Sequence, residues 1–376
     1  MSLKKLQIIG SAVFSITIIG IILNIISLLV YLKPTMRRSS IGVLLISLTL
    51  IEIGFLVSSL FPYSIPNLPI WKNQHSLGSF HIVFLAYSVQ YIYPIAMMCK
   101  TSCHLILVAI TVERWIAVCR PLQVQVWCTR KKAFKTVLFI VLTAVILNLS
   151  RFFEHKIGSI QLNGTDYTVS QPYLKSPKNF PNYYFYYYFL ASLMFNTFIP
   201  SLVISILNII VIKNLCESNK RRLNMTNQEQ KENNTTKMLI ILTISFVLAN
   251  IFIPIPKLIK ITWPDFFENE ATKWIAGILV QVGNFMTLLY DSSTFLIYFV
   301  FSKRFRDHTL VLFGLKDSSL VSTVQTKQNP EQNQKLIQTR KRASEGVLPT
   351  KLPSKPQQRT KSLQHSKMSD TGGSAP

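Results

Sequence analysis

Seven apolar stretches, separated by short polar segments, make up most of the chain. They cover residues 8–32, 41–65, 84–119, 134–154, 183–212, 237–261 and 274–301. Each reaches the roughly 20 residues that a helix needs to cross the hydrocarbon core of a bilayer. The first is longer than the core of about 7–15 residues in a cleavable signal peptide, so we expect it to be retained. The pattern predicts an all-α membrane protein, a seven-transmembrane helix bundle over residues 8–301 after a short N-terminus of residues 1–7.

The loops between these stretches differ in their content of lysine and arginine. Loops 33–40, 120–133 and 213–237 hold three, four and six such residues, whereas loops 66–83, 155–182 and 262–273 hold one, three and one. Basic loops remain on the cytoplasmic side of a membrane. We therefore predict a multi-pass protein of the plasma membrane with its N-terminus outside and its C-terminus inside, and with the loop 213–237 as a polar linker.

The composition agrees with a membrane protein, because 49% of the residues are hydrophobic and only 15% are charged. The net charge is +24, but the basic residues occur in short blocks, so we expect no nucleic-acid partner. The five cysteines all fall within the membrane or on its inner side, which leaves none for an outer disulfide. No metal-ligand spacing and no nucleophile–base motif occurs, so we expect no cofactor, no metal and no enzymatic activity.

Four of the apolar stretches carry a strongly polar group at mid-membrane depth: Asn24, Glu52, Lys100 and Asp291. Lys100 lies fourteen residues from Arg114, or about 21 Å along a helix, too deep to reach either surface easily. Unpaired charges are costly there, so we expect Lys100 to form an ion pair with Asp291 or Glu52. The same groups leave open a transporter or proton-conducting bundle, although no internal repeat supports one.

The end of the third stretch, Glu113-Arg114-Trp115, resembles the Asp/Glu-Arg-Tyr signature of rhodopsin-like G-protein-coupled receptors. Asn24 and Tyr298 also match positions of that superfamily, and Glu52 stands where it has aspartate. The resemblance implies that Glu113 holds Arg114 at rest and that Arg114 turns toward a heterotrimeric G protein when the sixth helix moves outward. Trp115 and Tyr298 would belong to the same switch. No lysine lies between Trp274 and Ser302, so a retinal pigment is excluded.

The end of the fourth stretch, Arg151-Phe152-Phe153-Glu154, is similar to the corresponding string of invertebrate FMRFamide-type neuropeptide receptors. That resemblance implies an extracellular RFamide-type peptide as ligand. Its candidate contacts are Arg151, Glu154, Asp265, Glu268 and Glu270. A chemosensory receptor for a small molecule is the alternative. The superfamily's cysteine at the top of the third helix is Val89 here, and the second outside loop has no cysteine to pair with it.

The remaining expectations concern the sixth helix, the outside loop and the C-terminal region. Pro254 predicts a hinge in the sixth helix, because proline frees a backbone carbonyl and permits a kink. Asn163-Gly164-Thr165 is an N-glycosylation acceptor on an outside loop. Residues 302–313 resemble the superfamily's amphipathic eighth helix at the membrane surface. Residues 314–376 are basic, rich in serine and threonine and expected to be disordered, a tail on which arrestin and kinases would act.

Overall fold

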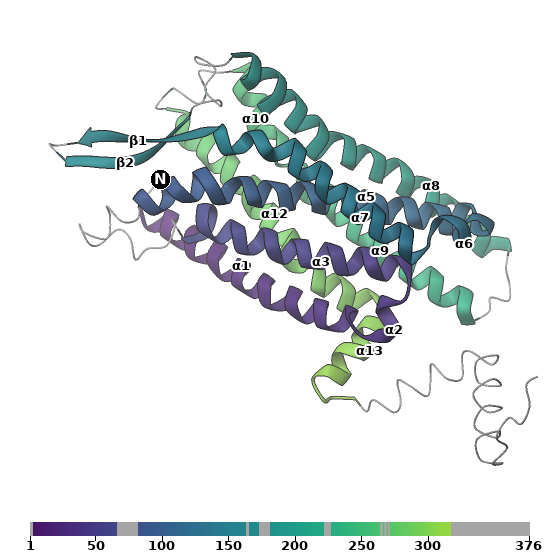
Figure 1. Ribbon diagram of the computed structural model, residues 1–376. Helices are drawn as coiled ribbons and strands as arrows, with labels where there is room; N and C mark the ends of the chain where they lie inside the picture. The colour runs from purple at the N-terminus through teal and green to yellow at the C-terminus, as the bar shows by residue number, and fades with distance from the viewer. Residues whose placement is uncertain are drawn as a thin grey trace, which may run out of the picture. The chain divides into compact units, whose positions relative to one another are not determined.

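The computed structural model describes residues 3–65, 82–162, 165–172, 181–221, 227–263, 266, 269 and 271–316, which lie in one compact unit that spans Met1–Asp317. The long helices lie side by side (Figure 1). They are α1 (Leu3–Tyr31), α3 (Ser40–Ser59), α5 (Tyr93–Cys119), α7 (Arg130–Asn148), α8 (Ile199–Arg221), α9 (Asn227–Asn250) and α12 (Lys273–Phe301). Short helices are α2 (Pro34–Arg37), α6 (Val124–Trp127), α10 (Pro254–Thr262) and α13 (Lys303–Leu312). The predicted C-terminal tail lies outside the described residues.

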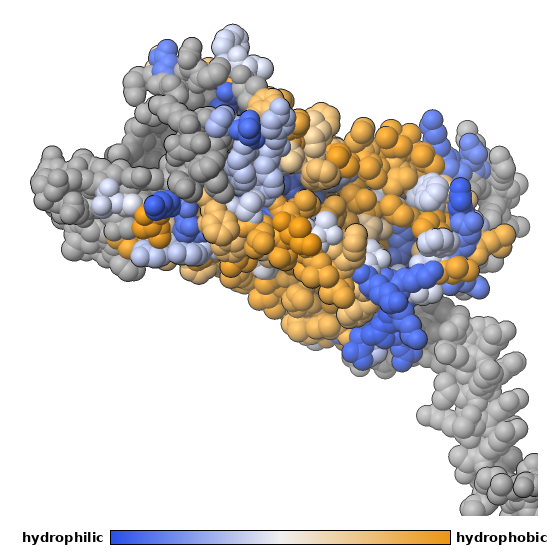
Figure 2. All heavy atoms as spheres, turned by 45° about the horizontal axis from the view of Figure 1, so that its top comes forward, coloured by the Kyte–Doolittle hydropathy of each residue, from blue (hydrophilic) through white to orange (hydrophobic). Residues whose placement is uncertain are grey.

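Within the described residues, six helical stretches are each long and apolar enough to cross a membrane: Ser11–Tyr31, Ser40–Ser64, Ile82–Cys119, Arg130–Phe153, Met194–Glu217 and Thr236–Lys260. A seventh stretch, Trp274–Phe301, qualifies together with Lys303–Leu312, and the two helices meet at a bend of 102°. Apolar side chains cover the middle of the face drawn in Figure 2. The predicted seven-transmembrane helix bundle is confirmed.

Several helix ends differ from the predicted ones. α1 begins at Leu3, so most of the predicted N-terminal segment 1–7 is helical. α8 continues to Arg221 and α9 begins at Asn227, so much of the predicted linker 213–237 is helix. Glutamine, glutamate and lysine favour helix, and a helix can extend beyond the membrane wherever its residues permit. The hydrophobic pattern predicts only the apolar part of each helix, so it does not predict the polar ends of α8 and α9.

The sixth span is broken close to the predicted hinge. α9 ends at Asn250, a turn covers residues 251–253, and α10 starts at Pro254. The ring of Pro254 occupies the first helical position, where a backbone N–H would lack an intrahelical acceptor in any case. The proline therefore starts a second helical segment and separates the outer part of the span from its inner part.

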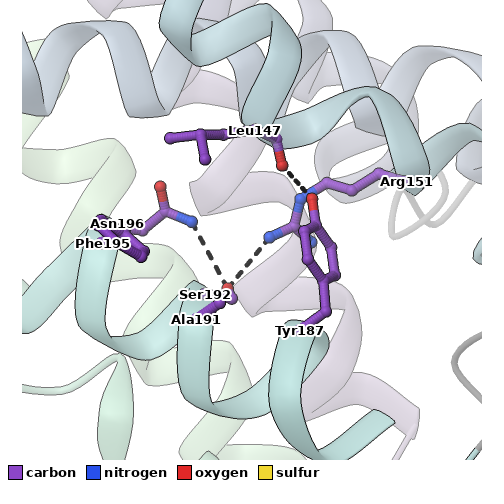
Figure 3. A pocket seen from close by; sticks show the side chains of 7 residues that line it. All are labelled: Leu147, Arg151, Tyr187, Ala191, Ser192, Phe195 and Asn196. Carbon is purple, nitrogen blue, oxygen red and sulfur yellow. Dashed lines mark hydrogen bonds between the residues drawn. The ribbon is translucent and has the colours of Figure 1, made fainter. Parts of the chain in front are cut away.

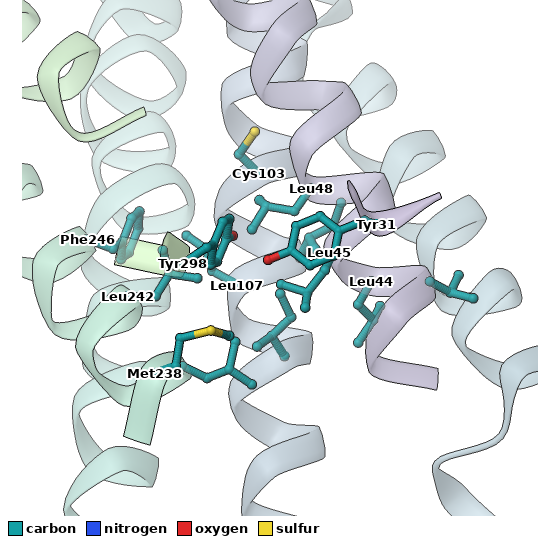
Figure 4. Packing of buried hydrophobic residues seen from close by; sticks show 14 of the residues in the cluster. Tyr31, Leu44, Leu45, Leu48, Cys103, Leu107, Met238, Leu242, Phe246 and Tyr298 are labelled. Atoms are coloured by element: carbon teal, nitrogen blue, oxygen red, sulfur yellow. The ribbon is translucent and has the colours of Figure 1, made fainter. Parts of the chain in front are cut away.

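The centre of the bundle is built around α5, which packs against α3, α7, α8 and α9. Leu48, Leu107, Leu242, Phe246 and Tyr298 belong to one buried cluster (Figure 4). Lipid tails are as apolar as leucine, so helices in a membrane associate mainly through close packing and interhelical hydrogen bonds. Leucine and aromatic side chains fill the inner half of the bundle accordingly.

A small residue brings α1 against α12. A Cβ atom built on Gly20 would collide with the side chain of Ser292, so only glycine allows this approach. Ser292 Oγ donates a hydrogen bond to the carbonyl of Ile16, at 3.2 Å. The close crossing places Asn24, one turn after Gly20, within reach of the backbone of α12.

The segment between the fourth and fifth spans contains a β-hairpin, which the helical fold class did not include. β1 (His155–Leu162) pairs antiparallel with β2 (Thr165–Pro172), with Leu162 opposite Thr165. Asn163-Gly164, read in the sequence as part of a glycosylation acceptor, is also the strongest dipeptide signal for a two-residue hairpin turn. Its own conformation lies outside the described residues. At the foot of the hairpin, Gln90 Nε2 donates to the carbonyl of Phe152 at 2.7 Å.

Helix α13 docks against the inner end of the bundle. Ser302 caps it by accepting a hydrogen bond from the backbone N–H of Phe305 at 3.3 Å. Phe305 is fully buried against Tyr31 and Tyr298, so this side chain anchors the helix to the bundle as well as lying on its apolar face. Burial, reinforced by Lys33 and Arg304, lowers the pKa of His308, whose Nε2 lies 3.1 Å from Thr35 Oγ1.

Candidate functional site

The predicted acid–base pair lies near the C-terminal end of α5. Arg114 Nη2 is 3.9 Å from Glu113 Oε1, and the side chains are 13% and 11% exposed. The other carboxylate oxygen, Glu113 Oε2, accepts a hydrogen bond from Ser40 Oγ at 3.0 Å. Ser40 begins α3, so this bond ties the acid to the second span. The separation of 3.9 Å is longer than a hydrogen bond, which makes the ion pair a loose restraint.

Arg114 also borders a gap between three helices. This narrow gap, too small to hold a water molecule, is lined by Ile110, Thr111, Arg114, Asn208, Leu239, Ile240 and Thr243. Asn208 Nδ2 on α8 donates to Thr243 Oγ1 on α9 at 2.8 Å. The arginine therefore lies where the fifth and sixth spans meet the third. A movement of α9 away from α5 would open the space next to its guanidinium.

The other two predicted switch residues occupy different surroundings. Trp115 packs beside a small cluster formed by Val211, Leu215 and Ile240, and its ring lies 5.2 Å from the guanidinium carbon of Arg120. Tyr298 on α12 is fully buried, with its ring 5.3 Å from that of Tyr31 and 5.6 Å from that of Phe305. Tyr298 thus connects α1, α12 and α13 by aromatic packing.

The intramembrane polar core forms around Thr294. Asn24 Nδ2 donates to the carbonyls of Gly20 at 3.0 Å and Asp291 at 2.8 Å. Thr294 Oγ1 lies within hydrogen-bond distance of Asn24 Oδ1, at 3.2 Å, and of Glu52 Oε2, at 3.3 Å. Asn24 and Glu52 are fully buried, and Asp291 is 5% exposed. Polar groups from α1, α3 and α12 therefore meet at one level of the bundle.

Lys100 does not form the predicted ion pair. Its Nζ donates to Thr287 Oγ1 on α12 at 3.3 Å and lies 5.8 Å from the centre of the Phe55 ring. Thr287 is one helical turn from Asp291, so the lysine stops one turn short of the carboxylate. Among the described ion pairs, those with side chains at most 13% exposed join Glu113 to Arg114 and Arg151 to Glu154. The lysine is a neighbour of the polar core and not a member of its hydrogen-bond network.

The second buried ion pair lies at the end of the fourth span. Arg151 donates from Nη1 to Glu154 Oε1 at 3.2 Å, from Nε to Asn148 Oδ1 at 2.7 Å and from Nη2 to Ser192 Oγ at 3.0 Å. Tyr183 OH donates to the same Glu154 oxygen at 3.4 Å. Arg151 is 3% exposed and Glu154 is fully buried. Arg151 and Glu154, which belong to the sequence string similar to that of FMRFamide-type receptors, therefore form a hydrogen-bond network inside the protein.

This network gathers residues from several spans (Figure 3). Arg151, Ser192 and Asn196 border a small cavity of about 20 Å³ between α7 and the fifth span, beside Leu147, Tyr187, Ala191 and Phe195. Lys257 Nζ on α10 also donates to Ser192 Oγ, at 3.2 Å. One serine hydroxyl thus accepts from the fourth and the sixth spans. The π-helical segments Tyr183–Ala191 and Met194–Phe198, on either side of Ser192, widen the fifth span at this level.

Hydrogen bonds continue from this network toward the middle of the bundle. Asn148 Nδ2 donates to Thr101 Oγ1 at 3.0 Å, and Thr101 Oγ1 donates to Asn196 Oδ1 at 2.7 Å. His104 Nδ1 lies within hydrogen-bond distance of the Asn196 carbonyl. The His104 ring meets the Phe246 ring on α9 edge-on, with centroids 4.8 Å apart. The chain of contacts therefore leads from the outer end of α7 to the sixth span.

The predicted ligand contacts divide into two groups. Arg151 and Glu154 are buried and paired with each other in this conformation, where neither side chain is exposed. Aromatic and charged residues at a helix end suggest an exposed belt in the sequence, but only the packed bundle shows which of them point inward. Asp265, Glu268, Glu270 and the glycosylation acceptor Asn163 lie outside the described residues.

Sequence reasoning missed the partners that complete these networks. Ser40, Ser192 and Asn196 carry no motif that marks them in an apolar segment. Thr294 has a recognisable signal, because it stands where the superfamily has asparagine, and in the structure it bonds within the polar core. Serine and threonine can also bond to their own helix backbone, so their interhelical partners emerge only when the helices are assembled.

Fold and site together define a class: a seven-helix membrane protein with an arginine near the end of the third span and a polar core between the first, second and seventh spans. A family model described as serpentine type 7TM GPCR chemoreceptor Srw matches residues 11–316. The chain belongs to this family of serpentine seven-transmembrane G-protein-coupled receptors. Its membership excludes the alternative of a transporter or proton-conducting bundle.

Three curated receptors show the similarity in more detail. The chain is 35% identical to the FMRFamide peptide receptor frpr-18 of Caenorhabditis elegans over 84% of this chain and 71% of that receptor. It is 26% identical to the FMRFamide receptor of Drosophila melanogaster, over 81% of this chain and 53% of the relative. It is also 26% identical to the Drosophila melanogaster sex peptide receptor, over 62% of this chain and 58% of the relative.

Proposed function

We propose that this receptor responds to an FMRFamide-like neuropeptide outside the cell and activates a heterotrimeric G protein inside it. The observation that carries the proposal is the 35% identity with the FMRFamide peptide receptor frpr-18 over most of both chains. The excess of lysine and arginine in the loops 33–40, 120–133 and 213–237 supports an N-terminus outside and a C-terminus inside. Arrestin and kinases would act at the C-terminal tail.

The ligand would first meet the acidic third outer loop. Asp265, Glu268 and Glu270 offer carboxylates to the arginine of a peptide that ends in Arg-Phe-amide, by charge-assisted hydrogen bonds. Glu154 lies deeper, and its Oε2 is buried without a hydrogen-bond partner. In this proposal Glu154 pairs with Arg151 at rest, and its Oε2 accepts a further hydrogen bond when the outer ends of the helices rearrange.

The buried contacts supply a route by which that rearrangement would reach the inner face. Ser192 accepts bonds from Arg151 and from Lys257 on α10, so a shift of α10 alters the Arg151 network directly. The break at residues 251–253 lets α10 and α9 move differently. A ligand that favours the arrangement with α9 displaced from Arg114 would shift the population toward the G-protein-coupled state.

The test measures nucleotide exchange on a G protein co-expressed with the receptor. A peptide ending in Arg-Phe-amide is expected to stimulate exchange, and the same peptide with a free C-terminal carboxylate serves as the matched control. Neutralising Asp265, Glu268 and Glu270 singly to Asn or Gln should raise the half-maximal peptide concentration about tenfold for at least one of them, which corresponds to 1.4 kcal/mol. No stimulation by any Arg-Phe-amide peptide at any dose contradicts the peptide assignment.

A chemosensory receptor for a small molecule is the second candidate, and the chain's match to a family of chemoreceptors favours it. The same exchange assay separates the two functions. Stimulation by a small organic molecule, with no response to amidated peptides, would support the second candidate. Stimulation by either kind of ligand would support coupling to a G protein.

A further inference from the structure

Along α7, a stripe of exposed apolar side chains is followed by exposed lysines near the inner end of the helix. Leu138, Leu142, Ile146 and Leu149 are exposed apolar residues at helical spacing. Following the same spacing toward the start of the helix leads to Lys135 and Lys131, which are also exposed. Long lysine side chains can extend along apolar surface and hold their ammonium groups at the level of lipid headgroups.

Aromatic residues place the membrane boundary at the same level. Trp127, in α6, is 59% exposed, and Lys132 Nζ lies 4.7 Å from the centre of its ring. Phe134, in the first turns of α7, is 62% exposed. Tryptophan and other amphipathic side chains gather where hydrocarbon meets headgroups. The basic residues that start α7 therefore lie at the interface itself.

Among the described residues, the cations at the start of α7 have no acidic partner. Arg130, Lys131, Lys132 and Lys135 fall within six residues, and no aspartate or glutamate occurs between Glu113 and Glu154. Within the described part of the chain none of the four forms an ion pair. Their mutual repulsion is unfavourable, as is the placement of three of them beside the positive end of the α7 dipole. A multiply charged anion at this level would relieve both effects.

We propose that the inner end of α7 binds an anionic lipid with a multiply phosphorylated headgroup, a phosphoinositide of the inner leaflet. Lys131 and Lys135 contact the headgroup from the lipid-facing stripe, and Arg130 and Lys132 flank it. Four cations match a headgroup with several negative charges better than the single net charge of phosphatidylserine. The proposal rests on the proposed orientation, with this end of the helix inside the cell.

The test is native mass spectrometry of the detergent-solubilised full chain with added phosphatidylinositol bisphosphate or phosphatidylserine. We expect the bisphosphate to bind more tightly. The double variant Lys131→Gln/Lys135→Gln should weaken its binding by about fivefold for each cation removed. The matched control Lys303→Gln/Arg304→Gln removes the same charge from α13 and should change binding by no more than about twofold. Lys131→Arg/Lys135→Arg should retain the affinity.

Three results would overturn the proposal: equal binding of the two lipids, equal losses in the two glutamine double variants, or no loss in the α7 variant. If the α7 double variant does not fold, the single variants Lys131→Gln and Lys135→Gln carry the test, each with an expected loss of about fivefold. The readout needs no peptide and no G protein. A receptor that binds the lipid but ignores every peptide would refute the proposed ligand alone.

Discussion

The receptor contains two buried arginine–glutamate pairs that differ in how completely they are satisfied. At the outer end of α7, Arg151 and Glu154 are 3.2 Å apart, and Asn148, Ser192 and Tyr183 supply further hydrogen bonds. At the inner end of α5, Arg114 and Glu113 are 3.9 Å apart and both remain partly exposed. The same two residue types thus form a tight network in one region and a loose contact in the other.

The surroundings of an ion pair therefore decide whether it stabilises the fold or can act as a switch. Removing one partner of a buried pair strands a charge, at a cost of about 3–5 kcal/mol. Glu113 and Arg114 are too far apart for a hydrogen bond, and the carboxylate keeps its bond from Ser40, so the pair can separate without breaking a direct hydrogen bond between its members. The outer pair is suited to hold three spans together, and the inner pair is suited to a switch.

The largest effect is expected from breaking the outer pair. Arg151→Met leaves Glu154 buried without its cation, and we expect stability to fall by about 3–5 kcal/mol, with little folded receptor at the cell surface. Adding Glu154→Gln should restore part of the loss, because no unpaired charge then remains. Surface staining and thermal unfolding provide the measurement, with Arg130→Gln at the other end of the same span as the control. Normal stability of Arg151→Met would show that the outer network is not structural.

Breaking the inner pair should affect signalling and leave stability nearly unchanged. Arg114→Ala breaks no direct hydrogen bond to Glu113, so we expect it to cost less stability than Arg151→Met and to reach the surface at near-normal levels, yet to lose G-protein activation. Arginine is a permanent cation at the inner mouth, and alanine cannot replace its hydrogen bonds. Ligand-stimulated nucleotide exchange per surface receptor is the measurement. Arg120→Ala removes a neighbouring cation and should retain most of the response, whereas normal signalling by Arg114→Ala contradicts the assignment.

The smallest effect, on basal nucleotide exchange, is expected from weakening the restraint on the Glu113–Arg114 pair. Ser40→Ala removes the hydrogen bond to Glu113 Oε2, worth about 0.5–1.5 kcal/mol, and should raise basal nucleotide exchange a few fold. Its neighbour Ser39 caps α3 by accepting a bond from the backbone N–H of Gly42 at 3.1 Å. Ser39→Ala should therefore reduce stability without raising basal exchange. Equal basal activities in the two variants would argue against Ser40 as part of the restraint.

Much of the fold can be predicted from the sequence because crossing a membrane imposes a simple local rule. Each span must be apolar for about 20 residues and must satisfy its own backbone hydrogen bonds as a helix. Seven apolar stretches therefore predict seven spans, and Pro254 predicts the interruption between α9 and α10. The polar ends of α8 and α9 escaped this rule, since a helix outside the hydrocarbon core need not be apolar.

The sequence by itself determined that strongly polar groups lie in the spans, and the bilayer makes each of them seek a partner. Only the tertiary structure decided which partners they find. Gly20 admits α12 closely enough for Asn24 to reach the Asp291 carbonyl, whereas Lys100 meets Thr287 before it can reach the Asp291 carboxylate. Arg151 and Glu154 turn inward because Ser192 and Asn148, from two different spans, complete their hydrogen bonds there. Such choices depend on how the helices are rotated and spaced against each other, which hydrophobic periodicity along one chain does not specify.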